Sequence, residues 1–284
     1  RVFDGQNLLE NAAVVYKNGV IEQVGNGPKL GQACNHTLDL GDATILPGFI
    51  EAHAHITFQN VSRDTVLKHG ITTARDTGGP LLPPQGGKGS LRLLSVGPIL
   101  QAAGGYPLNV FGGGDGGYDK IGLPVATISE AEHVVTDLIA GGATAIKIAL
   151  EPGGETGAPW MQPHEGPVPA TPWPLLPQEI VNAIVAKAHN LGKRVIVHAG
   201  ENEGFERALN AGVEIQIEVE TLAQLKEALE CGATSVLLDN FELAAMREAV
   251  ALNAGRAELE VSGGVQLEQL RDIAATGEIG RAHV

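Results

Sequence analysis

The sequence predicts an α/β fold, a (β/α)8 TIM-like barrel preceded by a small, partial β-sandwich. Two observations lead to this class. Beyond residue 45, strand-like segments alternate with amphipathic helices. In the last third of the chain, a cycle of helix, glycine and strand recurs about every twenty residues, which is typical of βα units. Because such barrels carry function at the carboxyl ends of their strands, we expect the site residues there.

Residues 1–46 read as β structure that precedes the barrel. The pair Asn18-Gly19 lies between two strand-like runs, 13–16 and 20–24. This pair is a strong hairpin signal because a type I′ turn requires positive φ at both central residues. The sequence therefore predicts a small sheet here, the partial sandwich.

Eight candidate strands follow. Five are assigned to a first barrel portion, residues 47–214, and three to a second, residues 215–277. The Gly-rich segment 101–127 and the Pro-rich segment 151–177 follow strands directly, so we expect them to be irregular binding loops over the mouth. Plain surface insertions are the alternative. The candidate strands are 48–55, 71–76, 91–96, 145–149, 194–199, 215–219, 235–238 and 257–261.

The helices between these strands have recognisable ends. Ser129 and Glu132 have the spacing of a capping box and open a predicted helix over 129–139. Pro177 precedes a predicted helix over 178–191, in keeping with the preference of proline for the first helical turn. Three later helices are each closed by a glycine: 222–230, 242–252 and 267–275.

Composition limits the partners. The chain has 284 residues and a net charge of −14, which argues against nucleic-acid binding because that needs clustered Lys and Arg. It contains no apolar run of membrane-spanning length. Cys34 and Cys231 are far apart and lack metal-ligand or redox spacing, so we expect free thiols. The expected partner is a small-molecule substrate, and a homo-oligomer is compatible with the sequence.

The chain begins at Arg1 without a Met and enters directly into a strand-like segment. We therefore expect the natural N-terminus to lie upstream. No signal peptide is visible, and the expected location is cytoplasmic, unless a signal peptide stands in the missing part.

The segment 46–55, which reads Leu-Pro-Gly-Phe-Ile-Glu-Ala-His-Ala-His, carries the clearest chemistry. In a strand, residues two apart point to the same face, so His53 and His55 would project together into the barrel. Neutral imidazoles suit Zn²⁺ and similar first-row ions. Two strand histidines on their own often have no such role, and the surrounding residues favour ligation.

This segment resembles the first barrel strand of the metal-dependent amidohydrolase superfamily, in particular its imidazolonepropionase-like members. Those enzymes usually have Asp at the position of Glu51. The resemblance implies a centre of one or two divalent ions, zinc above all, that activates water to hydrolyse a C–N bond. The matching segments that follow are 70–79, 142–148 and 195–199.

Lys147 stands between two isoleucines in an apolar run. Alternation places it on one face with Ala145 and Ala149, and a buried ammonium is costly unless it is paired or neutralised. The resemblance implies that Lys147 reacts with CO₂ and that the resulting carbamate bridges two metal ions. The alternative is a lysine that snorkels out of a strand end.

His198 ends the apolar run 195–198. A satisfied core histidine would be the default interpretation of such a residue alone. Within the resemblance it corresponds to the third histidine ligand, which belongs to the second metal. The remaining histidines receive no role: His36, His69, His133, His164, His189 and His283.

Two residues that the resemblance requires have no counterpart. The family pattern places a histidine at the end of the sixth strand and an aspartate, which takes the proton of the attacking water, at the end of the eighth. After residues 211–214 no histidine occurs until His283. We therefore expect weak metal binding and little or no turnover.

Three later segments resemble the C-terminal barrel portion of quinolinate phosphoribosyltransferase, an enzyme of NAD biosynthesis. The resemblance implies that Glu218 and Asp239 help to position Mg²⁺ and the ribose diphosphate. It also implies that a phosphate lies by Ser262, Gly263 and Gly264. The alternative is that these acids are solvated and the glycines only turn the chain. The three segments are 215–222, 237–240 and 259–265.

The transferase resemblance lacks that family's N-terminal domain and its basic residues, and residues 278–284 resemble neither family. Two partial enzymes in one chain indicate a chimera, from an assembly error or a deliberate recombination of barrel fragments. We expect a metal-dependent amidohydrolase acting on a small cyclic amide or dipeptide-like substrate. If the five and three strands close into one barrel, Glu218 or Asp239 could partly replace the missing ligands. The alternatives are a phosphoribosyltransferase fragment and a non-catalytic product of a joined reading frame.

Overall fold

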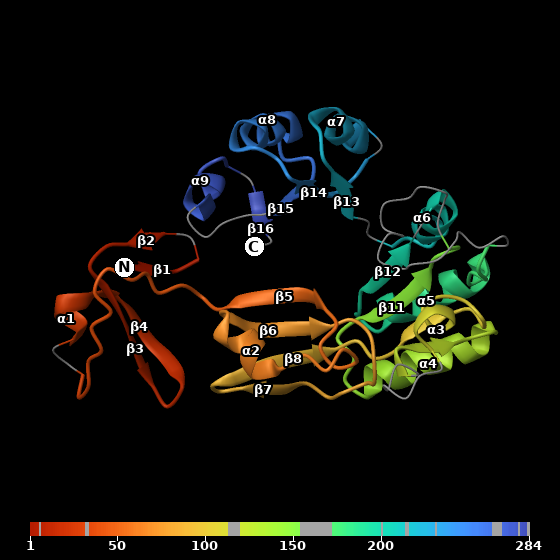
Figure 1. The fold of residues 1–284 in the computed structure, drawn as a ribbon, viewed down its shortest axis with the longest axis horizontal. Coiled ribbons are helices and arrows are strands. Elements are labelled where there is room, and N and C mark those ends of the chain that lie inside the picture. The colour runs from red at the N-terminus through yellow and green to blue at the C-terminus, as the bar shows by residue number, and fades with distance from the viewer. Residues whose placement is uncertain are drawn as a thin grey trace. The chain divides into compact units, whose positions relative to one another are not determined.

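The computed structural model describes residues 1–5, 7–31, 34–112, 120–153, 172–199, 201–213, 216–230, 232–262, 269–277 and 279–282. The chain divides into two compact units, Arg1–Glu201 and Asn202–Val284. Both contain strands and helices, which alternate regularly from β10 onward (Figure 1). The division falls at the first residue of helix α6 (Glu201–Asn210).

The N-terminal part of the first unit forms two small antiparallel sheets. Strand β1 (Val2–Phe3) pairs with β2 (Leu8–Leu9), and β3 (Ala12–Lys17) pairs with β4 (Val20–Asn26). Between β3 and β4, Asn18 and Gly19 have φ values of 52° and 78°. The predicted hairpin is confirmed, with positive φ at both turn residues as a type I′ turn requires. The short helix α1 (Gly27–Gly31) follows β4.

The next sheet provides the first site residues. Its parallel strands β5 (Phe49–Ala54), β6 (Ile71–Asp76) and β8 (Ser90–Ser95) lie side by side, and β7 (Gln85–Gly87) adds an antiparallel edge to β8. Helix α2 (Arg63–Lys68) connects β5 to β6. A buried cluster of Ile56, Ala74, Leu91 and Leu93 packs in this part of the unit.

A second sheet of the first unit is entirely parallel. Its order is β10 (Gly122–Pro124), β9 (Ile99–Gln101), β11 (Ile146–Leu150) and β12 (Val195–Ala199). Every residue of β11 is buried, which explains its apolar run because a parallel strand is covered on both faces. The helices of this part are α3 (Leu108–Phe111), α4 (Ile128–Ala140) and α5 (Gln178–Asn190).

The start of α4 differs from the prediction. Thr127, with an extended backbone, is the N-cap, and its side chain accepts a hydrogen bond from the Glu130 N–H at 3.2 Å. The Glu130 carboxylate in turn accepts one from the Ala126 N–H at 2.8 Å. The N-cap therefore lies two residues upstream of Ser129, and the assignment to Ser129 and Glu132 was wrong. Thr127 and Glu130 have the same spacing as that pair, and the backbone leaves its extended conformation at Thr127.

The second unit is a parallel sheet with its own core. The strand order is β13 (Gln216–Val219), β14 (Ser235–Asp239), β15 (Glu258–Ser262) and β16 (Ile279–Ala282). Its helices are α7 (Leu222–Glu230), α8 (Leu243–Asn253) and α9 (Leu270–Ala274). The fully buried core includes Leu225, Val236 and Leu238. Strand β16 falls in the segment 278–284, where the sequence predicted no strand.

All eight predicted strands are present, as β5, β6, β8, β11, β12, β13, β14 and β15. Within the described part of the chain they pair in three separate four-stranded sheets. The structure is thus an α/β fold built on parallel strands. The segment 101–127, predicted to be irregular, contains α3 and β10 in its described part. None of the helices that the structure describes has the length and apolarity needed to cross a bilayer.

Candidate metal centre

His53 lies in β5, and His55 follows the last residue of that strand. Their ring centroids are 5.5 Å apart. The chain after His55 is held by Asp76, which ends β6 and is only 2% exposed. The Asp76 carboxylate accepts hydrogen bonds from the N–H of Ile56 at 3.1 Å and of Thr57 at 3.0 Å, and from the Thr57 hydroxyl. This carboxylate therefore fixes the direction in which the chain leaves β5.

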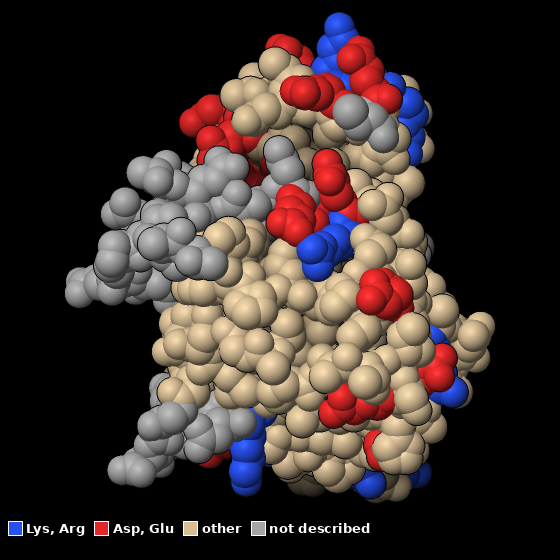
Figure 2. Space-filling model, turned by 90° about the vertical axis from the view of Figure 1, so that its right-hand side faces the viewer, with Lys and Arg blue, Asp and Glu red and all other residues tan. Residues whose placement is uncertain are grey.

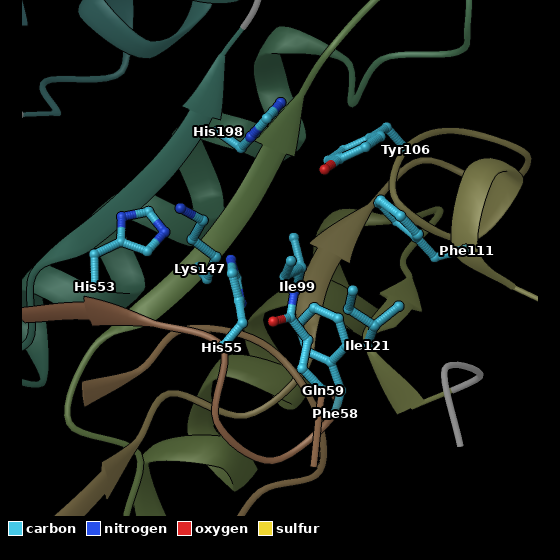
Figure 3. Close-up of a pocket in the computed structure, with 10 residues that line it drawn as sticks. All are labelled: His53, His55, Phe58, Gln59, Ile99, Tyr106, Phe111, Ile121, Lys147 and His198. Carbon is cyan, nitrogen blue, oxygen red and sulfur yellow. The ribbon is translucent and has the colours of Figure 1, made fainter. Parts of the chain in front are cut away.

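Lys147 and His198 come from neighbouring parallel strands. Lys147 pairs with Ile196, and Ala149 pairs with His198, so both functional side chains project from the same face of the sheet. Lys147 is 2% exposed, so it does not snorkel into solvent. Figure 3 shows His53, His55, Lys147 and His198 directed toward a common space.

That space is a pocket of about 190 Å³. One wall is polar and consists of the four predicted ligands, whereas the opposite wall is apolar and continuous with a buried cluster around Ile99 and Ile121. The lining residues in the described part of the chain are His53, His55, Phe58, Gln59, Ile99, Tyr106, Phe111, Ile121, Lys147 and His198 (Figure 3).

The electrostatics of the pocket favour neutral nitrogen atoms. Burial, followed by the nearby Lys147 charge, lowers the pKa of His53 to about 3 and that of His55 to about 4. Burial lowers the pKa of Lys147 to about 8. Both imidazoles are therefore neutral at pH 7, and each has a lone pair to donate. The buried Nδ1 of His55 has no hydrogen-bond partner in the described residues, which is uncommon for a buried polar atom.

Two further residues of this site were missed by the sequence analysis. Glu151 follows β11 and is 1% exposed. Its Oε1 accepts a hydrogen bond from the Gly153 N–H at 2.7 Å, and its Oε2 lies 3.4 Å from Nε2 of His198. Tyr106 stacks on His198 with ring centroids 4.5 Å apart, and burial, followed by the charge of Glu151, raises its pKa to about 12. For Glu151, the sequence signal that could have identified it is its alternation with Lys147 and Ala149 along the chain.

The second unit brings together the acids that the transferase resemblance named. Carboxylate oxygens of Glu218, Glu220 and Asp239 lie within 4.8 Å of one another. Burial, followed by Asp239 and Glu220, raises the pKa of Glu218. Glu220 was not predicted. Ser262 pairs in register with Asp239, whereas Gly263 and Gly264 lie outside the described residues.

The surface charge agrees with the acidic composition. On the face drawn in Figure 2, basic side chains of the described residues lie singly or beside acidic ones instead of forming one continuous patch.

Two comparisons of sequence support the two resemblances. Residues 183–281 match the family model described as quinolinate phosphoribosyl transferase, C-terminal domain. The chain is 37% identical over 65 residues to a probable nicotinate-nucleotide pyrophosphorylase (carboxylating) of Bacillus subtilis (strain 168). The aligned residues make up 23% of this chain and 22% of that protein. It is 34% identical over 56 residues to imidazolonepropionase of Aliivibrio salmonicida (strain LFI1238). This alignment makes up 19% of this chain and 14% of that protein. The matches thus span less than a quarter of either relative.

Solved structures show the fold. A crystal structure of an amidohydrolase matches with a TM-score of 0.53 and 20% identity over 97% of this chain and 70% of that chain. A Xaa-Pro dipeptidase with bound methionine in its active site matches with a TM-score of 0.52 and 19% identity, over 97% of this chain and 82% of that one. The family match begins at residue 183, inside α5 and upstream of the predicted junction. The chain thus joins a segment similar to imidazolonepropionase to a segment similar to the C-terminal domain of quinolinate phosphoribosyltransferase.

Proposed function

We propose that the chain carries the metal centre of an amidohydrolase-type enzyme. The reaction is hydrolysis of a C–N bond in a small cyclic amide or dipeptide-like substrate, and the strands close into a (β/α)8 barrel. One observation carries the proposal: three histidines and a buried lysine, drawn from β11, β12 and the end of β5, line a single pocket. Their imidazole and amine nitrogens are of the kind that a divalent first-row ion binds.

The donor set fits a divalent first-row ion. His53, His55 and His198 offer imidazole nitrogens, which Zn²⁺ binds readily. Such an ion, when bound, supplies Lewis acidity to an amide carbonyl and lowers the pKa of a coordinated water. The residues themselves are held rigidly: Asp76 anchors the exit of β5, and Tyr106 stacks on His198.

Lys147 contributes through its lowered pKa. Its neutral amine attacks the carbon of CO₂, a new N–C bond forms as one C–O π bond breaks, and the amine proton passes to solvent. The product is a carbamate, whose negatively charged oxygens can serve as metal ligands. Without this reaction the charged form of the side chain would be the ammonium, which burial disfavours. The pKa of about 8 leaves an accessible fraction of free amine at neutral pH.

The opposite wall supports a substrate class. Phe58, Ile99 and Tyr106 offer flat and branched apolar surface next to the histidines. A pocket of about 190 Å³ admits a small ring rather than an extended chain. We therefore propose that the substrate places an apolar ring against this wall and its C–N bond toward the histidines.

Turnover in this chain is low. The late histidine and aspartate of the amidohydrolase pattern have no counterpart in the sequence after Gly212, where His283 is the one remaining histidine. Without that aspartate the attacking water lacks its usual proton acceptor.

Metal analysis tests the proposal. The purified chain is expected to hold close to one equivalent of zinc or a similar ion, and His53→Ala and Lys147→Ala are expected to lose most of it. His133→Ala is the matched control, because His133 lies on α4 with a side chain 79% exposed. A folded wild-type chain without bound metal would contradict the proposal.

One alternative has its own observation. The match over residues 183–281 and the cluster of Glu218, Glu220 and Asp239 favour a phosphoribosyltransferase fragment that binds Mg²⁺. Under that alternative, quinolinate with Mg²⁺ raises the temperature of unfolding and zinc does not. Under the hydrolase proposal, zinc raises the temperature of unfolding and quinolinate with Mg²⁺ does not.

A further inference from the structure

Glu151 is a buried carboxylate to which the proposed metal centre assigns no role. It stands four residues after Lys147, at the position where alternation along β11 returns to the same face. His198 lies opposite Ala149, between the two along that face. The topology of two adjacent parallel strands thus brings Lys147, His198 and Glu151 into one row.

The two oxygens of Glu151 have different surroundings. Oε1 accepts the Gly153 N–H, whereas Oε2 is buried without a hydrogen-bond partner among the described residues. A buried ionised oxygen is costly unless it is paired or coordinates a cation. The charge of Glu151 also contributes to the raised pKa of Tyr106, a lining residue, so this carboxylate acts on the pocket itself.

The distance from Glu151 to His198 fits a shared cation. Oε2 lies 3.4 Å from Nε2 of His198, the separation of an ion pair if His198 is protonated, yet these atoms do not form a hydrogen bond. Two ligand atoms that share one tetrahedral zinc, each about 2.0–2.2 Å from the ion, lie about 3.3–3.5 Å apart. The separation therefore also fits neighbouring ligands on one cation, which would satisfy the buried Oε2 with His198 neutral.

We propose that Glu151 is a metal ligand, binding through Oε2 the same ion as Nε2 of His198. This inference rests on the proposed metal centre. It gives the site a protein carboxylate from the first unit, in a chain whose sequence lacks the late aspartate. The occupant is a divalent ion that accepts mixed nitrogen and oxygen ligands, as Zn²⁺ does.

The test compares Glu151→Gln with wild type. Zinc affinity is measured by competition with a chromophoric chelator, and the visible absorption of the Co²⁺-loaded chain reports the ligand set. Glutamine keeps the size of the side chain and an acceptor oxygen but removes the charge. Glu179→Gln is the matched control, because Glu179 is exposed in the first turn of α5. Circular dichroism of every variant verifies the fold.

A ligand role predicts that Glu151→Gln weakens zinc binding by more than about 100-fold and changes the Co²⁺ spectrum, while Glu179→Gln changes neither. If Glu151 only orients His198, affinity falls by no more than about 100-fold, the loss typical of outer-shell partners, and the Co²⁺ spectrum is unchanged. That result overturns the inference and leaves the proposed function standing.

A second variant, Glu151→Asp, keeps the charge and is expected to recover part of the affinity that Glu151→Gln loses. Equal loss in both variants, with a native circular dichroism spectrum, would also count against ligation. A wild-type chain that binds neither Zn²⁺ nor Co²⁺ would overturn the metal centre itself, and the inference with it.

Discussion

Asp76 illustrates how one buried carboxylate positions a neighbouring strand. Its two oxygens accept the N–H groups of Ile56 and Thr57, which directly follow His55. Asparagine offers one acceptor oxygen and turns an amide donor toward the other N–H, so a buried donor loses its partner. We expect Asp76→Asn to lower the free energy of unfolding by about 1–3 kcal/mol and to weaken metal binding. Urea unfolding measures the first effect, with the exposed Asp42→Asn as control.

The same residue predicts a dependence on pH. Burial raises the pKa of Asp76, so the folded state binds this proton more readily than the unfolded state does. Stability therefore increases as pH falls from the folded pKa to the ordinary carboxyl value. Measured against Asp76→Asn, the wild-type free energy of unfolding is expected to rise as pH falls through that window. A difference that is constant with pH would contradict the shift.

Lys147 allows a direct chemical test. The chain equilibrated with ¹³C-labelled bicarbonate and zinc is expected to show a carbamate carbonyl resonance by NMR. Lys147→Arg, which remains charged and cannot form this carbamate, is expected to lack the signal. Removal of bicarbonate is expected to lower zinc content in wild type and to leave that of Lys147→Arg unchanged. A signal that persists in the variant would place the carbamate elsewhere.

At this scale the sequence predicts what alternation makes visible. His53 and His55 share a face because they are two apart, and Lys147 is conspicuous in an apolar run. Glu151 and Tyr106 were not identified, because both stand beyond a strand end. There the direction of the side chain also depends on loop contacts, such as the hydrogen bond from the Gly153 N–H to Glu151, so the alternation from Lys147 to Glu151 was a weak signal by itself.

Elements depend on their ends, and α4 gives a test with an internal control. Thr127 caps the helix, whereas Ser129 is exposed within the first turn. Thr127→Ala is expected to lower the free energy of unfolding by about 1 kcal/mol. Ser129→Ala is expected to change it by less than about 0.5 kcal/mol, as for other exposed sites. Urea unfolding followed by circular dichroism measures both, and the reverse ranking would reinstate the predicted cap.

Long, buried elements were predicted well and short ones were not. Strand β6 has the predicted bounds, and helix α7 likewise. Strands β9 and β10, three residues each, were missed, since so few residues show no periodicity and are specified by pairing across the sheet. The parallel pairing of β9 with β11 depends on residues far apart in sequence, and local pattern does not contain it.

At the scale of the molecule, each unit has its own hydrophobic core. Leu225, Val236 and Leu238 form the centre of the second unit, while the candidate metal site lies wholly within residues 53–198 of the first. Sequence resemblance located both parts, because each retains the motifs of a different family. The boundary after residue 214 stays a prediction, because helix–strand units of the two families have the same local pattern.

Zinc is therefore expected to stabilise the two units unequally. At a free concentration 100 times the dissociation constant, ligand binding to the folded first unit adds about 2.7 kcal/mol to its stability. Hydrogen exchange measured by mass spectrometry on the full chain is expected to slow in peptides from β11 and β12 when zinc is added. Peptides from β14 and β15 are expected to exchange at an unchanged rate, and His53→Ala is expected to abolish the difference. Equal protection of both sets would mean that the units unfold as one cooperative body, whereas protection of β14 and β15 alone would move the metal site to the acidic cluster of Glu218 and Asp239.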